Sequence, residues 1–147
     1  MTTTLIGHEL HHDLLDHLKA VDQRWPDTGQ ATISTLNTRE VLVRLTELRD
    51  SLNDHFAVEE DHGLLPDGST SDPQFEDKES ALLKQHAGLR ERLNAVIASV
   101  PVNSERVSGW ASAKKHFDEF RKELQTHECA EIELIQTEFR DGPGTGD

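Results

Sequence analysis

The chain has 147 residues, enough for one domain with a sizeable core. Its formal charge of −13 argues against nucleic acid and anionic membranes as partners, because phosphate binding requires clustered Lys and Arg. We expect no signal peptide, and no apolar stretch approaches the roughly 20 residues of a membrane span. The single Cys129 rules out an intrachain disulfide, which favours a reducing, cytoplasmic location.

Amphipathic patterns predict two helices in the first half of the chain. The first runs from about Thr4 to Arg24 and stops at Pro26. The segment 26–37 is rich in loop-forming residues and is predicted to be a loop. A second helix begins near Thr38, and Gly63 and the proline that follows close it.

Two further helices are predicted in the second half. Asp72 followed by Pro73 is a strong helix start, with an N-cap residue and proline at the first helical position. Pro101 ends this third helix. Ser104 caps the fourth, which reaches about Arg140.

Four amphipathic helices with fairly short connections predict an all-α protein, an up-down-up-down antiparallel four-helix bundle. We expect one domain over residues 1–140. The tail 141–147 is acidic and rich in Gly, so it is predicted to be disordered.

Histidine and glutamate recur on these helices where the helical period calls for buried apolar residues. Burying such groups costs several kcal/mol each unless something pairs them. The residues are His11 on the first helix, His55 and Glu59 on the second, His86 on the third, and His127 and Glu131 on the fourth. A metal, and more readily a pair of metals, is the simplest agent that would pair them all.

The height of these residues along the bundle is an independent test of that interpretation. In an up-down-up-down arrangement, each lies roughly 10 to 20 Å from the same end, at about 1.5 Å per residue. Imidazole and carboxylate ligands without thiolate suit iron or manganese better than zinc. Two His-x-x-x-Glu pairs on facing helices can each offer an imidazole to one metal and a carboxylate that bridges two.

These residues lie in motifs that resemble the haemerythrin-like, HHE cation-binding domain. The resemblance covers nearly the whole chain, from about Leu5 to Arg140. The motifs are His11-x-x-Leu14, Leu52-x-x-His55-Phe56-x-x-Glu59-Glu60, His86-x-x-Leu89 and Leu124-x-x-His127-x-x-x-Glu131.

The resemblance implies a four-helix bundle with a non-haem di-iron centre, bridged by two carboxylates and an oxo, hydroxo or water oxygen. Manganese or zinc would be substitute metals. In this family the terminal imidazole ligands would correspond to His11, His55, His86 and His127. The bridging carboxylates would correspond to Glu59 and Glu131.

Two departures separate the chain from oxygen-carrying haemerythrins. Those proteins have a His-x-x-x-His pair on the third helix, and here Leu82 stands at the earlier position. Their fourth-helix carboxylate follows the histidine by five residues, whereas Glu131 follows by four. Both departures favour the wider HHE group over reversible oxygen carriage. One iron would then have an open position, filled by water or by Glu79, Glu128 or His8.

The competing interpretations of these extra residues are simpler. Glu79 fits a solvated or edge position, and Glu128, directly after a ligand, fits a flank of its helix. Glu60 is expected to be a surface charge or to support a ligand from outside. Five histidines are expected at the surface or the edge, namely His8, His12, His17, His62 and His116.

The expected function is a di-iron protein that binds or reacts with oxygen, peroxide or nitric oxide, including weak peroxidase or catalase-like activity. One alternative is an iron- or oxygen-responsive sensor that acts through a partner protein. Another is a metal-free helical interaction domain. We expect a monomer or weak homodimer.

Overall fold

The computed structural model describes residues 2–26, 35–65, 72–101 and 107–141. It describes the side chains of residues 12–26, 37–65, 72–101 and 109–137. These parts of the chain form four helices and no strand: α1 (Thr2–Arg24), α2 (Thr35–His62), α3 (Pro73–Ser99) and α4 (Val107–Asp141). The predicted all-helical class is confirmed.

Most helix boundaries fall close to their predicted positions, with one clear correction. The predicted loop 26–37 is too long, because α2 already begins at Thr35. The predicted cap at Ser104 and nearly all of the predicted tail, 142–147, lie outside the described residues. Asp141, the first residue of that tail, still belongs to α4.

The start of α3 follows directly from its sequence. The Asp72 side chain accepts a hydrogen bond from the Gln74 amide at 2.9 Å, which satisfies a helix N–H that has no partner within the helix. Pro73 occupies the first turn, where its missing N–H costs nothing. At the other end Val100 has extended backbone angles, as expected for a residue before proline.

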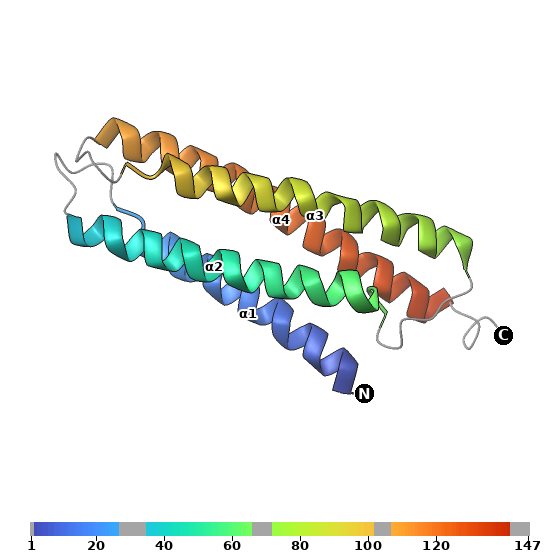
Figure 1. The fold of residues 1–147 in the computed structure, drawn as a ribbon. Coiled ribbons are helices and arrows are strands. Elements are labelled where there is room, and N and C mark those ends of the chain that lie inside the picture. The colour runs from blue at the N-terminus through green and yellow to red at the C-terminus, as the bar shows by residue number, and fades with distance from the viewer. Residues whose placement is uncertain (1, 27–34, 66–71, 102–106, 142–147) are drawn as a thin grey trace.

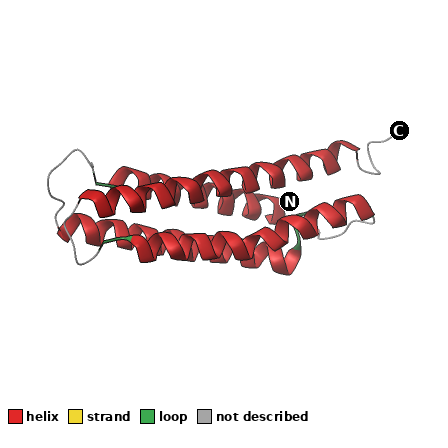
Figure 2. Ribbon diagram, turned by 90° about the horizontal axis from the view of Figure 1, so that it is seen from above, coloured by secondary structure: helices red, strands yellow, loops and turns green. Residues whose placement is uncertain are grey.

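The four helices lie side by side with their long axes roughly aligned (Figures 1 and 2). Each helix packs against the next one in the chain, α1 on α2, α2 on α3 and α3 on α4. The start of α1 and the end of α4 lie towards the same end of the molecule, where α2 also ends and α3 begins (Figure 1). None of the described helices has the length and hydrophobicity to cross a bilayer.

The apolar interior is divided into two clusters. The larger contains buried side chains from all four helices, including Leu14, Leu45, Leu93 and Phe117. The smaller comprises Leu64, Leu65, Phe75, Leu82 and Leu134.

Buried polar residues fall between the two clusters along α3 and α4. On α3, His86 lies between Leu82 of the smaller cluster and Leu89 of the larger one. On α4, His127 and its neighbours lie between Leu124 and Leu134 in the same way. This polar layer, defined as His55, Glu59, His86, His127, Glu128 and Glu131, holds the candidate site.

Candidate metal centre

The polar layer is deeply buried. Five of its six members are at most 4 % exposed, and the Glu59 side chain is 13 % exposed. Three helices supply them: His55 and Glu59 come from α2, His86 from α3, and the remaining three from α4. Burying this many ionisable groups is unfavourable unless a counter-charge or a metal pairs them.

The first donor group joins all three helices. It consists of Glu59, His86, His127 and Glu131, whose potential ligand atoms all lie within 4.8 Å of one another. The Nε2 atom of His127 lies 2.7 Å from Oε2 of Glu131, one turn further along α4. The Nε2 atom of His86 lies 3.0 Å from Oε1 of Glu59 and 3.6 Å from Oε2 of Glu131.

The second donor group lies between α2 and α4. It consists of His55, Glu128 and Glu131, again within 4.8 Å of one another. The Nε2 atom of His55 is 3.3 Å from Oε1 of Glu128 and 3.2 Å from Oε2 of Glu59.

Two carboxylates connect these groups. Glu131 belongs to both. Glu59 directs Oε1 towards His86 and Oε2 towards His55, so its two oxygens face two different histidines.

The buried atoms of the first group are suited to a cation. Nε2 of His86, Nε2 of His127, Oε1 of Glu59 and Oε2 of Glu131 are all buried, and within the described residues they face one another as close ion pairs without a well-aligned hydrogen bond. Buried polar atoms in proteins nearly always have a partner. These buried His and Glu side chains could therefore hold a metal ion.

Hydrogen bonds from outside the layer orient two of the imidazoles. Nδ1 of His86 donates to Oε2 of Glu60 at 2.8 Å, and Nδ1 of His127 donates to Oε1 of Gln85 at 2.8 Å. When neutral, each ring then carries its lone pair on Nε2, the atom that faces the carboxylates.

Without a metal, the charges in the layer compensate one another. Burial opposes protonation of His55, but Glu128 and Glu59 overcome it and raise its pKa to about 10. Burial likewise opposes protonation of His86, and Glu131, Glu59 and Glu60 raise its pKa to about 9.

The pKa values of Glu59 and Glu131 shift in opposite directions. Burial opposes ionisation of Glu59, yet His55 and His86 hold its pKa well below the usual range. Burial raises the pKa of Glu131 to about 9. Burial also lowers the pKa of His127. Metal binding to this layer must therefore displace protons.

Five of the six predicted ligands come together in the structure: His55, Glu59, His86, His127 and Glu131. The sixth, His11, lies in α1, but its side chain lies outside the described part of the chain. The side chain of His8, which was predicted as a substitute ligand, also lies outside the described part of the chain.

The expectation that Glu128 faces a flank of its helix is wrong. Its side chain is 3 % exposed and belongs to the second donor group. The relevant pattern was present in the sequence, because Glu128 follows Leu124 by four residues and precedes Glu131 by three. Those spacings place it on the buried face of α4.

Glu79 has a structural role instead. Gly63 takes a positive φ of 77° just after α2, and Oε2 of Glu79 accepts a hydrogen bond from the Leu64 amide at 2.9 Å. Glu79 is half-buried and belongs to neither donor group. Its carboxylate caps the turn that ends α2.

Leu82 is buried, as its position on the α3 stripe predicts, and lies one turn before His86. It packs in the smaller apolar cluster with Phe75 and Leu134. Four of the five expected surface histidines are also found, because His12, His62 and His116 are exposed and His17 lies 3.7 Å from Asp13 on the surface of α1.

No family model, curated protein or solved structure matches this chain.

Proposed function

We propose that this chain is a haemerythrin-like, non-haem di-iron protein that binds or reacts with oxygen, peroxide or nitric oxide. The observation that supports the proposal best is the pair of buried donor groups that share Glu131. A single metal would need only one such group. Glu59, with one oxygen towards His55 and the other towards His86, supports a second bridge.

The proposed fold is an up-down-up-down antiparallel bundle. It is supported by the packing of each helix on the next and by the common end shared by the start of α1, the end of α2, the start of α3 and the end of α4 (Figure 1). His11 on α1 is the fourth imidazole ligand that the family resemblance implies.

The residues divide into three roles. His86 and His127 would hold one metal, and His55 with Glu128 the other. Glu59 and Glu131 would bridge the two. Iron would supply a redox-active Lewis acid able to bind a small exogenous ligand, and mixed imidazole and carboxylate donors without thiolate suit it. Manganese or zinc are the substitute metals that the same donors would accept.

The chain's own groups would shape this chemistry. The three carboxylates offer negative charge against two cations in a buried space, which offsets the cost of burying either alone. The apolar clusters above and below keep bulk water from the layer, so a small neutral molecule enters more readily than a charged one.

Metal analysis tests the proposal. The protein is expressed in iron-rich medium, purified in air, and analysed for metal content and absorption. We expect about two iron ions per chain, one for each donor group. A preparation that takes up neither iron, manganese nor zinc, while remaining folded by circular dichroism, would refute the proposal and favour a metal-free helical domain.

An iron- or oxygen-responsive sensor is the alternative function for the same centre. Peroxide consumption separates the two. A holoprotein that disproportionates peroxide over many turnovers supports catalysis, whereas one that only changes stability or absorption when it binds the ligand supports sensing.

A further inference from the structure

Two residues outside the polar layer accept hydrogen bonds from its imidazoles. We infer that Glu60 and Gln85 are positioning residues, and that they give His86 and His127 unequal strength as ligands. The inference rests on the proposed function and deepens it, because it assigns roles to residues that do not themselves bind metal.

Each of the two residues is exposed and contacts a histidine on the next helix in the chain. Glu60 is on α2 and reaches His86 on α3, and Gln85 is on α3 and reaches His127 on α4. Glu60 and Gln85 are exposed, whereas the two histidines are at most 2 % exposed. Each bond of 2.8 Å holds Nδ1 from outside, so Nε2 points into the layer.

The two acceptors differ in charge. A carboxylate accepts a stronger hydrogen bond than an amide does, and it withdraws the Nδ1 proton further from the ring. The imidazole that bonds to a carboxylate is therefore the more basic ligand. On this ground His86, bonded to Glu60, is the stronger donor, and His127, bonded to Gln85, is the weaker.

The carboxylate of Glu60 is itself held in place. Nη1 and Nη2 of Arg90 lie 3.0 and 3.2 Å from its two oxygens. The Arg90 guanidinium also lies 5.3 Å from the centre of the Phe56 ring. Phe56 stacks on His86, with ring centroids 3.7 Å apart and planes within 2°. His86 is thus fixed both in its plane and at Nδ1.

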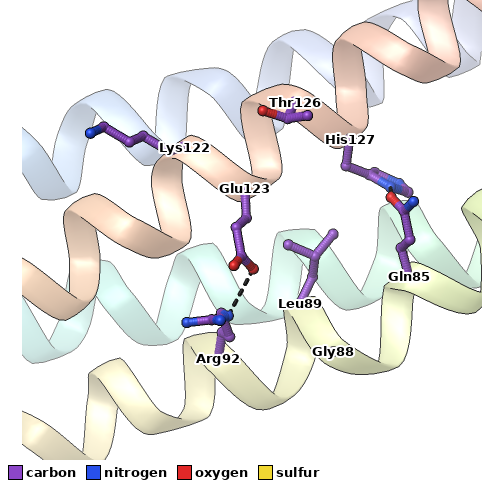
Figure 3. Close-up of a pocket in the computed structure, with 8 residues that line it drawn as sticks. All are labelled: Gln85, Gly88, Leu89, Arg92, Lys122, Glu123, Thr126 and His127. Atoms are coloured by element: carbon purple, nitrogen blue, oxygen red, sulfur yellow. Dashed lines mark hydrogen bonds and ion pairs between the residues drawn. The ribbon is translucent and has the colours of Figure 1, made fainter.

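The surroundings of His127 are more open. Gln85 and His127 point towards each other along one side of a pocket of about 460 Å³ between α3 and α4, which the Arg92–Glu123 ion pair borders (Figure 3). The pocket leaves room to replace the Gln85 amide with a carboxylate of the same shape. The acceptor can therefore be changed in opposite directions, from carboxylate to amide at Glu60 and from amide to carboxylate at Gln85.

The test uses Zn²⁺, which is diamagnetic, and protein labelled with ¹⁵N in histidine. We expect two ring N–H signals from Nδ1 in the zinc-loaded protein. Glu60→Gln shifts the His86 signal upfield and leaves the His127 signal in place. Gln85→Glu shifts the His127 signal downfield and leaves that of His86 in place. Glu60→Gln also weakens Zn²⁺ binding by about ten- to a hundredfold.

Matched controls separate hydrogen bonding from net charge. Glu91→Gln on α3 and Gln125→Glu on α4 make the same changes at exposed positions, and neither is expected to move a ring signal. Signals and affinities in Glu60→Gln and Gln85→Glu that match these controls would overturn the inference. If the chain bound no metal, the proposed function would fail, and the same ring signals in the metal-free protein would still decide the positioning roles.

Discussion

Glu128 on α4 reaches His55 on α2, with Oε1 of the carboxylate 3.3 Å from Nε2 of the imidazole and both side chains at most 5 % exposed. The contact joins two helices that are not consecutive in the chain, through the middle of the molecule. It also gives the second donor group a carboxylate of its own, beside the shared Glu131.

Replacing Glu128 should therefore remove one metal more readily than the other. In Glu128→Gln, which keeps the shape and loses the charge, we expect metal content to fall from about two ions per chain towards one. Affinity at the weaker position should fall by at least about tenfold. Isothermal titration measures both. Glu133→Gln, at an exposed position on α4, is the control, and two unchanged sites in Glu128→Gln would exclude Glu128 as a ligand.

Loss of a histidine should lower metal content and thermal stability together. Metal bound only to the folded state at a hundredfold above its Kd stabilises it by about 2.7 kcal/mol. At about 2–4 °C per kcal/mol, His55→Ala or His127→Ala should melt roughly 5–10 °C below the wild-type holoprotein. His116→Ala, at an exposed site on α4, should retain the wild-type Tm. If a chelator strips the metal from wild type without changing Tm, the centre does not contribute to folding.

Stability should depend on pH in opposite ways with and without metal. In the metal-free protein the pKa values of His55 and His86 rise from 6.5 to about 10 and 9, and that of Glu131 rises from 4.5 to about 9. The folded state thus binds more protons than the unfolded state between about pH 6.5 and 9. The free energy of unfolding of the metal-free protein should fall across that window.

The holoprotein should behave in the reverse sense. Protons compete with the metal for the imidazole nitrogens and carboxylate oxygens, so metal is released and stability falls as the pH drops below about 6.5. Urea denaturation of both forms from pH 5 to 9 measures the two slopes. Parallel slopes would mean that metal and protons do not compete for this layer.

Leu82→His tests how close the smaller cluster lies to the metals. An imidazole placed among Leu64, Phe75 and Leu134 should cost about 1–3 kcal/mol in the metal-free protein, because its polar atoms lose water. In the iron-loaded protein it should supply a further ligand and weaken azide binding. Ala81→His, at the exposed neighbouring position, is the control. Equal azide affinity and equal spectra in wild type and Leu82→His would place Leu82 away from the metals.

The sequence was sufficient to predict the helices and most of the polar layer because both follow one periodicity. His86 and His127 stand in line with leucines that are themselves buried, so their burial could be predicted from spacing alone. Glu128 was misassigned because its neighbour His127 was taken to define the buried face. The buried face of a helix in a bundle is wide enough to include residues on both sides of His127.

The helical periodicity could not predict contacts between helices. The bond from Glu79 to the Leu64 amide depends on the left-handed backbone of Gly63, which turns the chain at the end of α2. The bonds from Glu60 and Gln85 depend on the rotation of one helix against its neighbour. A pattern within one helix contains no information on that rotation. Glu60 could therefore be predicted only as a surface charge or as a support for an unspecified ligand, and Gln85 was left unassigned.

The polar layer also separates the two apolar clusters, which should differ in how easily they unfold locally. The larger cluster spans four helices and can remain closed by itself, whereas the smaller one consists of a few side chains that follow α2 or lie on α3 and α4. Without a metal to connect them, the smaller part should open locally while the larger stays folded, and its backbone amides should exchange with solvent deuterium much sooner. Metal would join the two into one unit that opens together, so that the amide of Leu134 becomes as protected as that of Leu93.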